Sequence, residues 1–385
     1  MNTIDKKIGI VGGGQLGKMM ILEAKRLGFY VAVLDPGSDC PSKSICDKLI
    51  TSDLSDPEGY IELSKHADVI TYEWENISIS ALETLENRGI PVFHTVRTLK
   101  EIQNKHAQKL ILQKNGIAVP RFRKVSTADD IKDAGRKENF GYPLMLKTTT
   151  GGYDGKGTAL IKIENDINTA FEQLGSGAVE LMVEEFVDFD KEISLVICRA
   201  RTASPSHVFF PIAENIHVNS ILDTTIVPAR ISKETTDKAY EIGNKLMSVL
   251  EFTGTFCIEM FAAKNGEVYV NEIAPRPHNS GHYTIEACFA NQFENHIRAI
   301  TGLPLGETSL QTPAVMINLI GQSNGPAKLH GLEQAYSYPN VHIHLYGKKE
   351  SKAGRKMGHY TVIDKDAKKA IELANKLRDT IKVTG

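Results

Sequence analysis

The sequence predicts an α/β protein of two or three domains that begins with a parallel sheet. The chain has 385 residues, 41% of them hydrophobic and 24% charged, so it can bury several cores. The first hundred residues alternate strand patterns with a helical pattern, which is typical of a βαβ unit. Further on, two short apolar segments flank a second glycine-rich stretch, and an Asn-Gly pair joins two more strands.

The N-terminal unit is predicted from KIGIVGGGQLGKMMILEAKRLGFYVAVLDP. A buried strand begins at Ile8, and YVAVLD forms the next strand. Between them lies a helix that Gly28 can cap, and its buried face carries Met19, Met20, Leu22, Ala24 and Leu27. Two sequential strands joined by a helix form a parallel, right-handed unit.

The turn of this unit contains Gly12, Gly14 and Gly17, which is the pattern GxGxxG, and Asp35 ends the second strand. In a dinucleotide-binding fold an acid at that place binds the ribose, so one interpretation is an NAD site. The alternative is that a close strand-to-helix turn needs the glycines, and that the helix N-terminus binds another anion or small ligand.

A third strand, Val69 to Tyr72, runs into Glu73, Glu75 and Asn76. Residues that follow the carboxyl end of a strand in an open α/β sheet face the ligand crevice. Two acids and an amide there suit a polar substrate, although a solvated loop is an equal alternative.

The stretch TTTGGYDGKG (residues 148–157) follows an apolar strand, Pro143 to Leu146, that ends on Lys147, and a second short strand covers 158–161. A tight hairpin needs only two to five loop residues, so this longer loop is suited to move and to bring backbone N–H groups to phosphate oxygens. The Walker A pattern is absent, and the spacing differs from that of the protein-kinase loop. The alternative is a flexible surface hairpin, which the preceding lysine disfavours.

A further strand, Val179 to Val183, meets Glu184, Glu185, Phe186 and Val187, and another strand covers 192–198. Acidic and apolar residues at a strand end can offer an adenine an apolar slot and hydrogen-bond partners. Plain sheet is the simpler alternative.

Two strands joined by Asn265-Gly266 form the strongest hairpin signal in the chain. With these as the two loop residues, counting pairs down the hairpin places Phe261 opposite Val270 and Glu259 opposite Glu272. Opposed carboxylates repel each other, and a magnesium ion between them would resolve the conflict. The alternatives are a proton shared by the pair and a slip of the register.

Polar residues surround the end of this hairpin. Strict alternation points Asn271 to the face opposite Glu272, unless the strand has already ended there. The loop that follows can reach between two ligands with Arg276, His278, Asn279, Ser280 and His282.

Near the C-terminus, nine positions hold five cations around Glu350: Lys348, Lys349, Lys352, Arg355 and Lys356. Such a run is usually a solvated hairpin loop. Nucleic acid is disfavoured because the formal net charge is −2 and only Tyr346 and Tyr360 are interleaved. A phosphate site for a ribonucleotide fits better, since Arg can grip phosphate with two donors.

The composition of the chain argues against several classes of protein. A net charge of −2 provides no global field for nucleic acid or an anionic membrane. The five cysteines include no CxxC pair, which fits a reducing cytosol. Neither a signal peptide nor an apolar run of ~20 residues is found, so we expect a cytoplasmic protein that does not bind membranes.

The order of a lysine, a glycine loop, EEFV, and then Glu and NE on a hairpin resembles the ATP-grasp carboxylate–amine ligases. Together, GGGQLGKMM, YEWENI, TTTGGYDGKG, NEIAPRPHNSGH and YGKKESKAGRKMGH resemble the N5-carboxyaminoimidazole ribonucleotide synthetases over nearly the whole chain. The resemblance implies an α/β ATP-grasp fold with a Rossmann-like N-terminal domain (1–104), an ATP-grasp domain (105–300, lid about 115–185) and a small C-terminal lobe (301–385).

The implied reaction uses ATP, magnesium (or manganese), bicarbonate and 5-aminoimidazole ribonucleotide (AIR), in purine synthesis. Bicarbonate takes the γ-phosphoryl group to give carboxyphosphate, and the AIR amine is then carboxylated. The products are N5-carboxyaminoimidazole ribonucleotide, ADP and phosphate. The resemblance also implies a homodimer with small-molecule substrates only.

The resemblance further implies roles for individual residues. ATP would contact Lys105, Lys147, Gly152, Tyr153, Asp154, Gly155, Lys156, Gly157, Glu184, Glu185, Phe186, Val187, Glu192, His217, Asn271 and Glu272. Magnesium would bind Glu259 and Glu272. The substrate would contact Gln15, Leu16, Glu73, Asn76, Arg276, His278, Asn279, Ser280, Lys348, Arg355 and Lys356. The catalytic set would be Tyr153, Asp154, Lys156, Lys348 and Arg355. The family often has Arg where this chain has Lys105, which keeps the charge but loses the bidentate fork.

Other classes compete with the ligase. An NAD-dependent dehydrogenase would explain GxGxxG and Asp35 but not the second glycine loop, the paired glutamates or the basic stretch. A non-catalytic nucleotide- or phosphoribosyl-binding protein gives no reason for opposed carboxylates. Among ligases, the formate-using glycinamide ribonucleotide transformylase and biotin carboxylase are near relatives.

Overall fold

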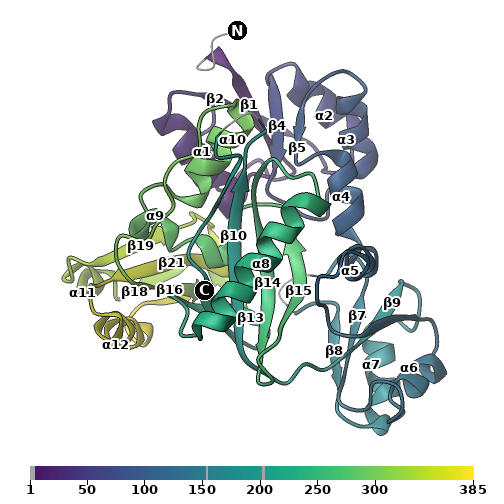
Figure 1. Cartoon of the computed structure of the whole chain (residues 1–385). Helices are drawn as coiled ribbons and strands as arrows, with labels where there is room; N and C mark the ends of the chain where they lie inside the picture. The colour runs from purple at the N-terminus through teal and green to yellow at the C-terminus, as the bar shows by residue number, and fades with distance from the viewer. Residues whose placement is uncertain (1–4, 153–154, 202–203) are drawn as a thin grey trace.

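The computed structural model describes residues 5–152, 155–201 and 204–385. Figure 1 shows an N-terminal α/β unit at the top, a small sheet with its helices at the lower right, and a large central sheet that continues into the C-terminal strands at the left. No helix in these ranges is both long and apolar enough to cross a bilayer.

The N-terminal unit confirms the predicted parallel sheet, whose strand order is β3-β2-β1-β4-β5. Alternate residues of the second strand face opposite sides, since Val31 and Val33 belong to one apolar cluster and Ala32 and Leu34 to another. Its strands are β1 (Lys7–Val11), β2 (Tyr30–Asp35), β3 (Lys48–Thr51), β4 (Val69–Tyr72) and β5 (Val92–Phe93). Its helices are α1 (Gln15–Arg26), α2 (Pro57–Ser64), α3 (Ile79–Glu86) and α4 (Val96–Gln103).

The small sheet has four strands in the order β6-β9-β7-β8 and follows α5 (Lys105–Lys114). Its strands are β6 (Phe122–Val125), β7 (Leu144–Thr148), β8 (Thr158–Ile161) and β9 (Leu181–Glu185). It also contains α6 (Ala128–Ala134), η2 (Glu164–Asp166) and α7 (Ile167–Gln173).

The strand predicted at Val179–Val183 is shifted by two residues. Because β9 pairs on both sides, the ladder continues through Glu184 and Glu185, opposite Met145 and Leu144 of β7. These two glutamates therefore lie within the strand and not after it.

The central sheet has nine strands. Its order is β15-β14-β10-β12-β13-β16-β21-β19, and β11 pairs with β10. The strands are β10 (Phe189–Arg199), β11 (His207–Phe209), β12 (Ala213–Val218), β13 (Ile221–Val227), β14 (Gly254–Ala263), β15 (Val268–Ala274), β16 (Ala314–Ile320), β19 (Val341–Leu345) and β21 (Lys356–Ile363). The C-terminal strands thus extend the central sheet, because β16 pairs with the edge of β13.

Helices and short ladders complete this part of the chain. The long helix α8 (Lys233–Val249) packs against β10, β14 and β15, as Figure 1 shows. The other helices are η3 (Asn279–Gly281), α9 (Thr284–Ala287), α10 (Gln292–Thr301), α11 (Leu332–Tyr336) and α12 (Ala367–Arg378). The short pairs are β17 (Gly325–Pro326) with β20 (Glu350–Ser351), and β18 (Lys328–His330) with β22 (Lys382–Thr384).

Two fully buried histidines join the N-terminal sheet to the central sheet. The Nδ1 atom of His94 accepts from the Thr253 N–H at 3.1 Å, and its Nε2 donates to the Thr255 carbonyl at 3.1 Å. His296 accepts from the Thr255 N–H at 3.0 Å and contacts the hydroxyl of Thr71 at 2.8 Å. Burial lowers the pKa of His94 to about 4 and that of His296 to about 3.

These histidines should make the fold less stable in mild acid. Between about pH 6.5 and pH 4 the unfolded chain binds protons that the folded chain excludes, so the free energy of unfolding falls as the pH falls. Each histidine contributes about 1.4 kcal/mol per pH unit to this slope. Urea unfolding of wild type and His296→Gln at pH 7.5 and 5.0 measures the effect, and the variant should lose less stability than wild type.

The exposed His330 provides the matched control, because His330→Gln should keep the wild-type slope. Equal slopes for His296→Gln and wild type would contradict the assignment.

Candidate active site

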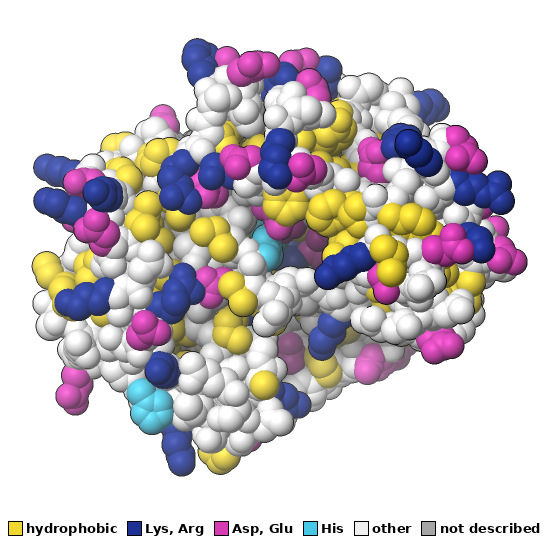
Figure 2. Space-filling model, turned by 90° about the horizontal axis from the view of Figure 1, so that it is seen from below, with side chains coloured by type: hydrophobic (Ala, Val, Ile, Leu, Met, Phe, Trp, Pro, Cys, Tyr) yellow, Lys and Arg dark blue, Asp and Glu magenta, His cyan; other side chains and the backbone are white. Residues whose placement is uncertain are grey.

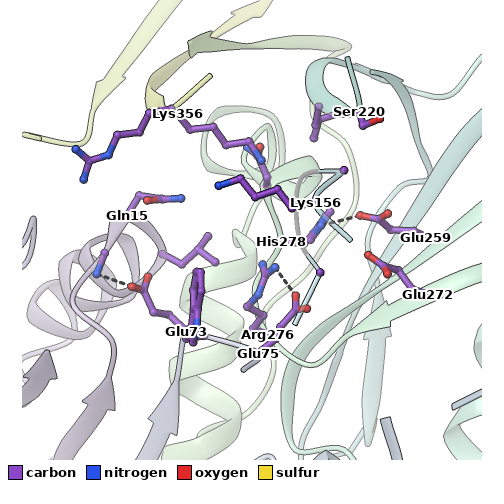
Figure 3. A pocket seen from close by; sticks show the side chains of 18 of the residues that line it. Gln15, Glu73, Glu75, Lys156, Ser220, Glu259, Glu272, Arg276, His278 and Lys356 are labelled. Carbon is purple, nitrogen blue, oxygen red and sulfur yellow. Dashed lines mark hydrogen bonds and ion pairs between the residues drawn. The ribbon is translucent and has the colours of Figure 1, made fainter. Parts of the chain in front are cut away.

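A cavity of about 1060 Å³ is lined by residues from all three parts of the fold. Figure 2 shows it from below as a hollow with acidic and histidine side chains in its depth and cationic side chains near its edge. In Figure 3, Glu259 and Glu272 lie next to each other on one side, and Gln15 and Glu73 lie on the other. The structure therefore brings together residues that are far apart in sequence.

Glu259 lies opposite Glu272 across β14 and β15, as the sequence predicts. The intermediate pairing is different, however: Phe261 faces Tyr269, so the predicted Phe261–Val270 pair is wrong. The Ala263 N–H donates to the Glu267 carbonyl at 2.9 Å, which makes the loop one residue longer than predicted. A bulge between Glu259 and Met260 then shifts the register back. Two shifts of one residue cancel, and the carboxylates still meet.

The residue added by the bulge is Asn271. Strict alternation would point it away from Glu272, and this prediction is wrong because the bulge interrupts the alternation. Its Oδ1 accepts a hydrogen bond from Lys147 Nζ at 3.0 Å, and both residues line the cavity.

Each of the facing carboxylates has its own cationic partner. Glu259 pairs with Nε2 of His278 at 2.8 Å, and Glu272 pairs with Lys105. Burial alone would raise the pKa of Glu259, but His278 and His217 hold it below its usual range. These partners offset the repulsion for which the sequence suggested a metal.

The two carboxylates nevertheless fit a magnesium ion that is also bound by substrate phosphates, because Mg²⁺ takes oxygen ligands and usually only one or two carboxylates. A group of three or more His, Cys, Asp or Glu side chains able to hold a metal is not found among the described residues. The two carboxylates could therefore supply only part of the oxygen ligands that a magnesium ion needs.

The glycine loop lies at the cavity beside Lys147. The Thr148 N–H donates to the Gly157 carbonyl at 2.8 Å, and Gly152, Gly155 and Lys156 line the cavity. Gly155 has a φ of +76°, and a Cβ atom there would lie 2.3 Å from Cβ of Ser220. Only glycine allows this loop to approach the turn between β12 and β13 so closely. Tyr153 and Asp154, predicted at the tip, lie outside the described residues.

The predicted adenine residues have distinct surroundings. Glu184 is buried and pairs with Lys147 at 2.9 Å and Lys109 at 3.1 Å. Glu185 binds Arg121 at 2.6 Å, while Phe186 and Val187 give the cavity an apolar edge. Glu192 and Nδ1 of His217 lie 3.0 Å apart, and Glu192 raises the pKa of His217 against the effect of burial.

The substrate residues predicted on the opposite side also line the cavity. They are Gln15, Leu16, Glu73, Arg276, His278, Asn279, Lys348, Arg355 and Lys356. Arg276 pairs with Glu75 in Figure 3. The basic stretch folds back on itself, because Lys348 Nζ donates to the Lys356 carbonyl at 2.7 Å and Arg355 donates to the Glu350 carbonyl at 2.8 Å. Lys349 ties it to Asp39 of the N-terminal unit at 2.7 Å.

Among the predicted site residues that the structure describes, three do not line the cavity. Asn76 is exposed to solvent, and Gly157 lies at the base of the glycine loop. Ser280 is fully buried behind His278, with its Oγ 2.8 Å from His278 Nδ1 and 2.7 Å from Ser194 Oγ. It can orient His278 but does not itself border the cavity.

The protein's own carboxylates fill the GxGxxG turn. Glu73 accepts hydrogen bonds from the backbone N–H groups of Gly14 and Gly17, and Asp35 accepts from that of Gly13 at 2.7 Å. A dinucleotide would need these N–H groups for its pyrophosphate and Asp35 for its ribose. The NAD interpretation is therefore wrong, and the carboxylate of Glu73 is committed to the turn although its side chain borders the cavity.

Two residues at or next to the cavity were not predicted from the sequence. Ser220 lines the cavity, and Lys109 pairs with Glu184 behind its wall. Ser220 follows Asn219 in a turn where both residues have positive φ, and no pattern along the chain links this turn to the glycine loop. Lys109 could have been predicted from its spacing, because residues four apart share a helix face and Lys105 is in the predicted site.

Replacing Glu73 by Gln should destabilise the N-terminal unit. The carboxylate of Glu73 accepts from two backbone N–H groups, one at each oxygen. The amide of glutamine has only one oxygen, so one of these N–H groups would lose its acceptor. A buried unsatisfied donor costs about 1–3 kcal/mol. Urea unfolding measures this loss. Glu172→Gln, at an exposed position of α7, is the control and should leave the free energy of unfolding unchanged. Equal stability of the two variants would contradict the role given to Glu73.

Three family models match successive parts of the chain. Residues 5–103 match the ribonucleotide synthetase preATP-grasp domain. Residues 110–293 match the ATP-grasp domain, and residues 314–373 match the phosphoribosylaminoimidazole carboxylase C-terminal domain.

Similar proteins cover almost the whole chain. The N5-carboxyaminoimidazole ribonucleotide synthase of Staphylococcus aureus (strain COL) is 44% identical over 362 residues, 93% of either protein. The crystal structure of N5-carboxyaminoimidazole ribonucleotide synthetase from Thermotoga maritima is 43% identical, with a TM-score of 0.88 and 99% of both chains covered. That of N5-carboxyaminoimidazole synthase from Aspergillus clavatus, in complex with ADP and 5-aminoimidazole ribonucleotide, is 34% identical, with a TM-score of 0.90 and 98% of both chains covered. The chain belongs to the N5-carboxyaminoimidazole ribonucleotide synthase family of ATP-grasp ligases.

Proposed function

We propose that this protein carboxylates AIR to N5-carboxyaminoimidazole ribonucleotide in purine biosynthesis, with conversion of ATP to ADP and phosphate. The observation that carries this proposal is the joint cavity, in which opposed carboxylates, three lysines and a basic hairpin surround one space. The Aspergillus clavatus relative, crystallised with ADP and AIR, supports the same pair of ligands here.

The chemistry proceeds in two displacements. A bicarbonate oxygen attacks the γ-phosphorus of ATP, the bond to the β-phosphate oxygen breaks, and ADP and carboxyphosphate form. The AIR amine then attacks the carboxyphosphate carbon, phosphate leaves with the C–O bonding electrons, and the amine loses a proton. Both displacements need positioned positive charge more than a covalent apparatus.

Lysine side chains at the cavity supply part of this positive charge. Lys105, Lys147 and Lys156 line the cavity near the facing carboxylates and neutralise the phosphates of ATP. Magnesium, or manganese in its place, would be held by Glu259 and Glu272 and would neutralise phosphate oxygens when bound. Phe186 and Val187 provide the apolar contact for adenine, and Glu192 the acceptor for ribose.

The basic hairpin supplies the site for the second substrate. Lys348, Arg355 and Lys356 hold the AIR phosphate, with Arg276 and His278 between the two ligands. Lys156 and the predicted Tyr153 and Asp154 complete the proposed catalytic set with Lys348 and Arg355. Closure of the glycine loop excludes water, which protects the labile carboxyphosphate.

The protein should release ADP only when AIR and bicarbonate are both present. A coupled ADP assay with each substrate omitted in turn measures this dependence. Equal ADP release with glycinamide ribonucleotide and formate, and none with AIR, would instead identify the transformylase reaction.

Glu272→Ala should abolish turnover while the protein still folds. The substitution removes one of two opposed acids, and Lys105 lies at the cavity with 19% of its side chain exposed, so its charge can be solvated. Activity measured against magnesium concentration, with circular dichroism as the check on folding, tests the prediction. Glu267→Ala, at the exposed turn of the same hairpin, should remain active. Magnesium-dependent turnover by Glu272→Ala would contradict the metal assignment.

We also propose, from the family resemblance, that the protein is a cytoplasmic homodimer with domain limits at 1–104, 105–300 and 301–385. Size-exclusion chromatography with light scattering tests the dimer, and limited proteolysis tests the limits.

A further inference from the structure

A second lysine of α5 lies beneath the part of the cavity proposed for the ATP phosphates. Lys109 is one helical turn after Lys105 and therefore on the same face of the helix. Its side chain is only 2% exposed, and it does not line the cavity. A lysine is almost never buried in this way unless its charge is paired.

The partner of Lys109 is Glu184, whose side chain is equally buried. Lys109 Nζ lies 3.1 Å from Oε1 of this carboxylate, while Lys147 Nζ lies 2.9 Å from Oε2. One carboxylate thus faces two ammonium groups. Burial alone would raise the pKa of Glu184, but the two lysines hold it below its usual value, so the carboxylate is charged.

Lys109 and Lys147 differ in the other groups that they can contact. Lys147 lines the cavity and also donates to Asn271 at 3.0 Å. Lys109 lies against Glu184 behind the cavity wall, at ion-pair distance but without an aligned hydrogen bond from its Nζ. Lys109 can therefore serve only Glu184, whereas Lys147 can serve Glu184 or a ligand.

We propose that Lys109 is a positioning residue: it is a counter-ion of Glu184 that does not border the cavity, and it thereby leaves the charge of Lys147 available to the phosphates of ATP. This inference rests on the proposed function, in which Lys147 binds ATP. Without Lys109, Glu184 would have Lys147 as its only cation within ion-pair distance among the described residues. The phosphates would then compete with a buried carboxylate for Lys147, because a buried charge is costly to leave unpaired.

The same geometry predicts a pH effect on ATP affinity. The charged groups that face Lys109 are Glu184 from β9, Lys147 from β7, and Lys105 from its own helix. Burial lowers the pKa of Lys109 to about 8 in spite of Glu184. As the pH rises through 8, Lys109 loses its proton, and the KM for ATP should rise.

Lys109→Met tests the proposal, because methionine keeps most of the side-chain volume and removes the charge. We expect the KM for ATP and the Kd for ADP to rise about tenfold, as for the loss of one interaction with a charged group, with a smaller change in kcat. Lys114→Met, at an exposed position of the same helix, is the matched control and should behave as wild type. The double variant Lys109→Met with Glu184→Gln should regain much of the lost affinity, since no carboxylate then retains Lys147.

Three results would overturn the proposal: an unchanged KM and Kd in a folded Lys109→Met protein, no recovery in the double variant, or a wild-type KM for ATP that stays constant from pH 7 to 9. The last measurement needs no variant, so it holds even where Lys109→Met fails to fold. Calorimetric titration with ADP needs no acceptor substrate. It therefore tests Lys109 even if the wild-type protein shows no AIR-dependent ADP release, a result that would count against the proposed function instead.

Discussion

The facing of Glu259 and Glu272 is the constraint on which the rest of the cavity depends. Opposed carboxylates on a ladder repel each other, so the surrounding chain has to bring cations to them. His278 comes from the loop after the hairpin, and Lys105 comes from the start of α5. These two ion pairs fix both segments against the hairpin, and the segments in turn bring α5 and the loop before α9 to the cavity.

Acidic residues elsewhere in the wall of the cavity are also paired with cations. Glu184 is matched by two lysines, Glu75 by Arg276, and Asp39 by Lys349. In each case the acid belongs to a different segment from its cation. Lys147 and Glu184 lie on the paired strands β7 and β9, and the other ion pairs join segments that no backbone ladder of the described residues connects. Cationic groups at the glycine loop and in the C-terminal basic stretch both reach the cavity. A molecule with phosphate at both ends would satisfy them together, and so would two phosphorylated molecules side by side.

Local patterns were enough to predict much of this fold. Short apolar runs located β2, β4 and β8 to the residue, and the Asn-Gly pair located the hairpin that carries both glutamates. The strand limits were less predictable where a charge continues a strand, as at Glu184, because the lysines that make this tolerable come from distant positions. The bulge at Asn271 was unpredictable for a similar reason, since the contact with Lys147 that it creates lies outside the hairpin. Ser280 was misplaced because its polarity serves a buried hydrogen bond to Ser194 and not a ligand.

The N-terminal glycine turn shows how a motif can be required without the ligand that usually accompanies it. A Cβ atom on Gly14 would lie 2.4 Å from Oε1 of Glu73, and one on Gly17 would lie 2.4 Å from the Gly12 carbonyl oxygen. The glycines are therefore needed for an anion to approach the start of α1, but the anion is a side chain from the end of β4. The neighbouring Gln15 and Leu16, which border the cavity, are held in place by that turn. In this family member the pattern GxGxxG thus forms part of the cavity wall and is closed by the protein's own carboxylates.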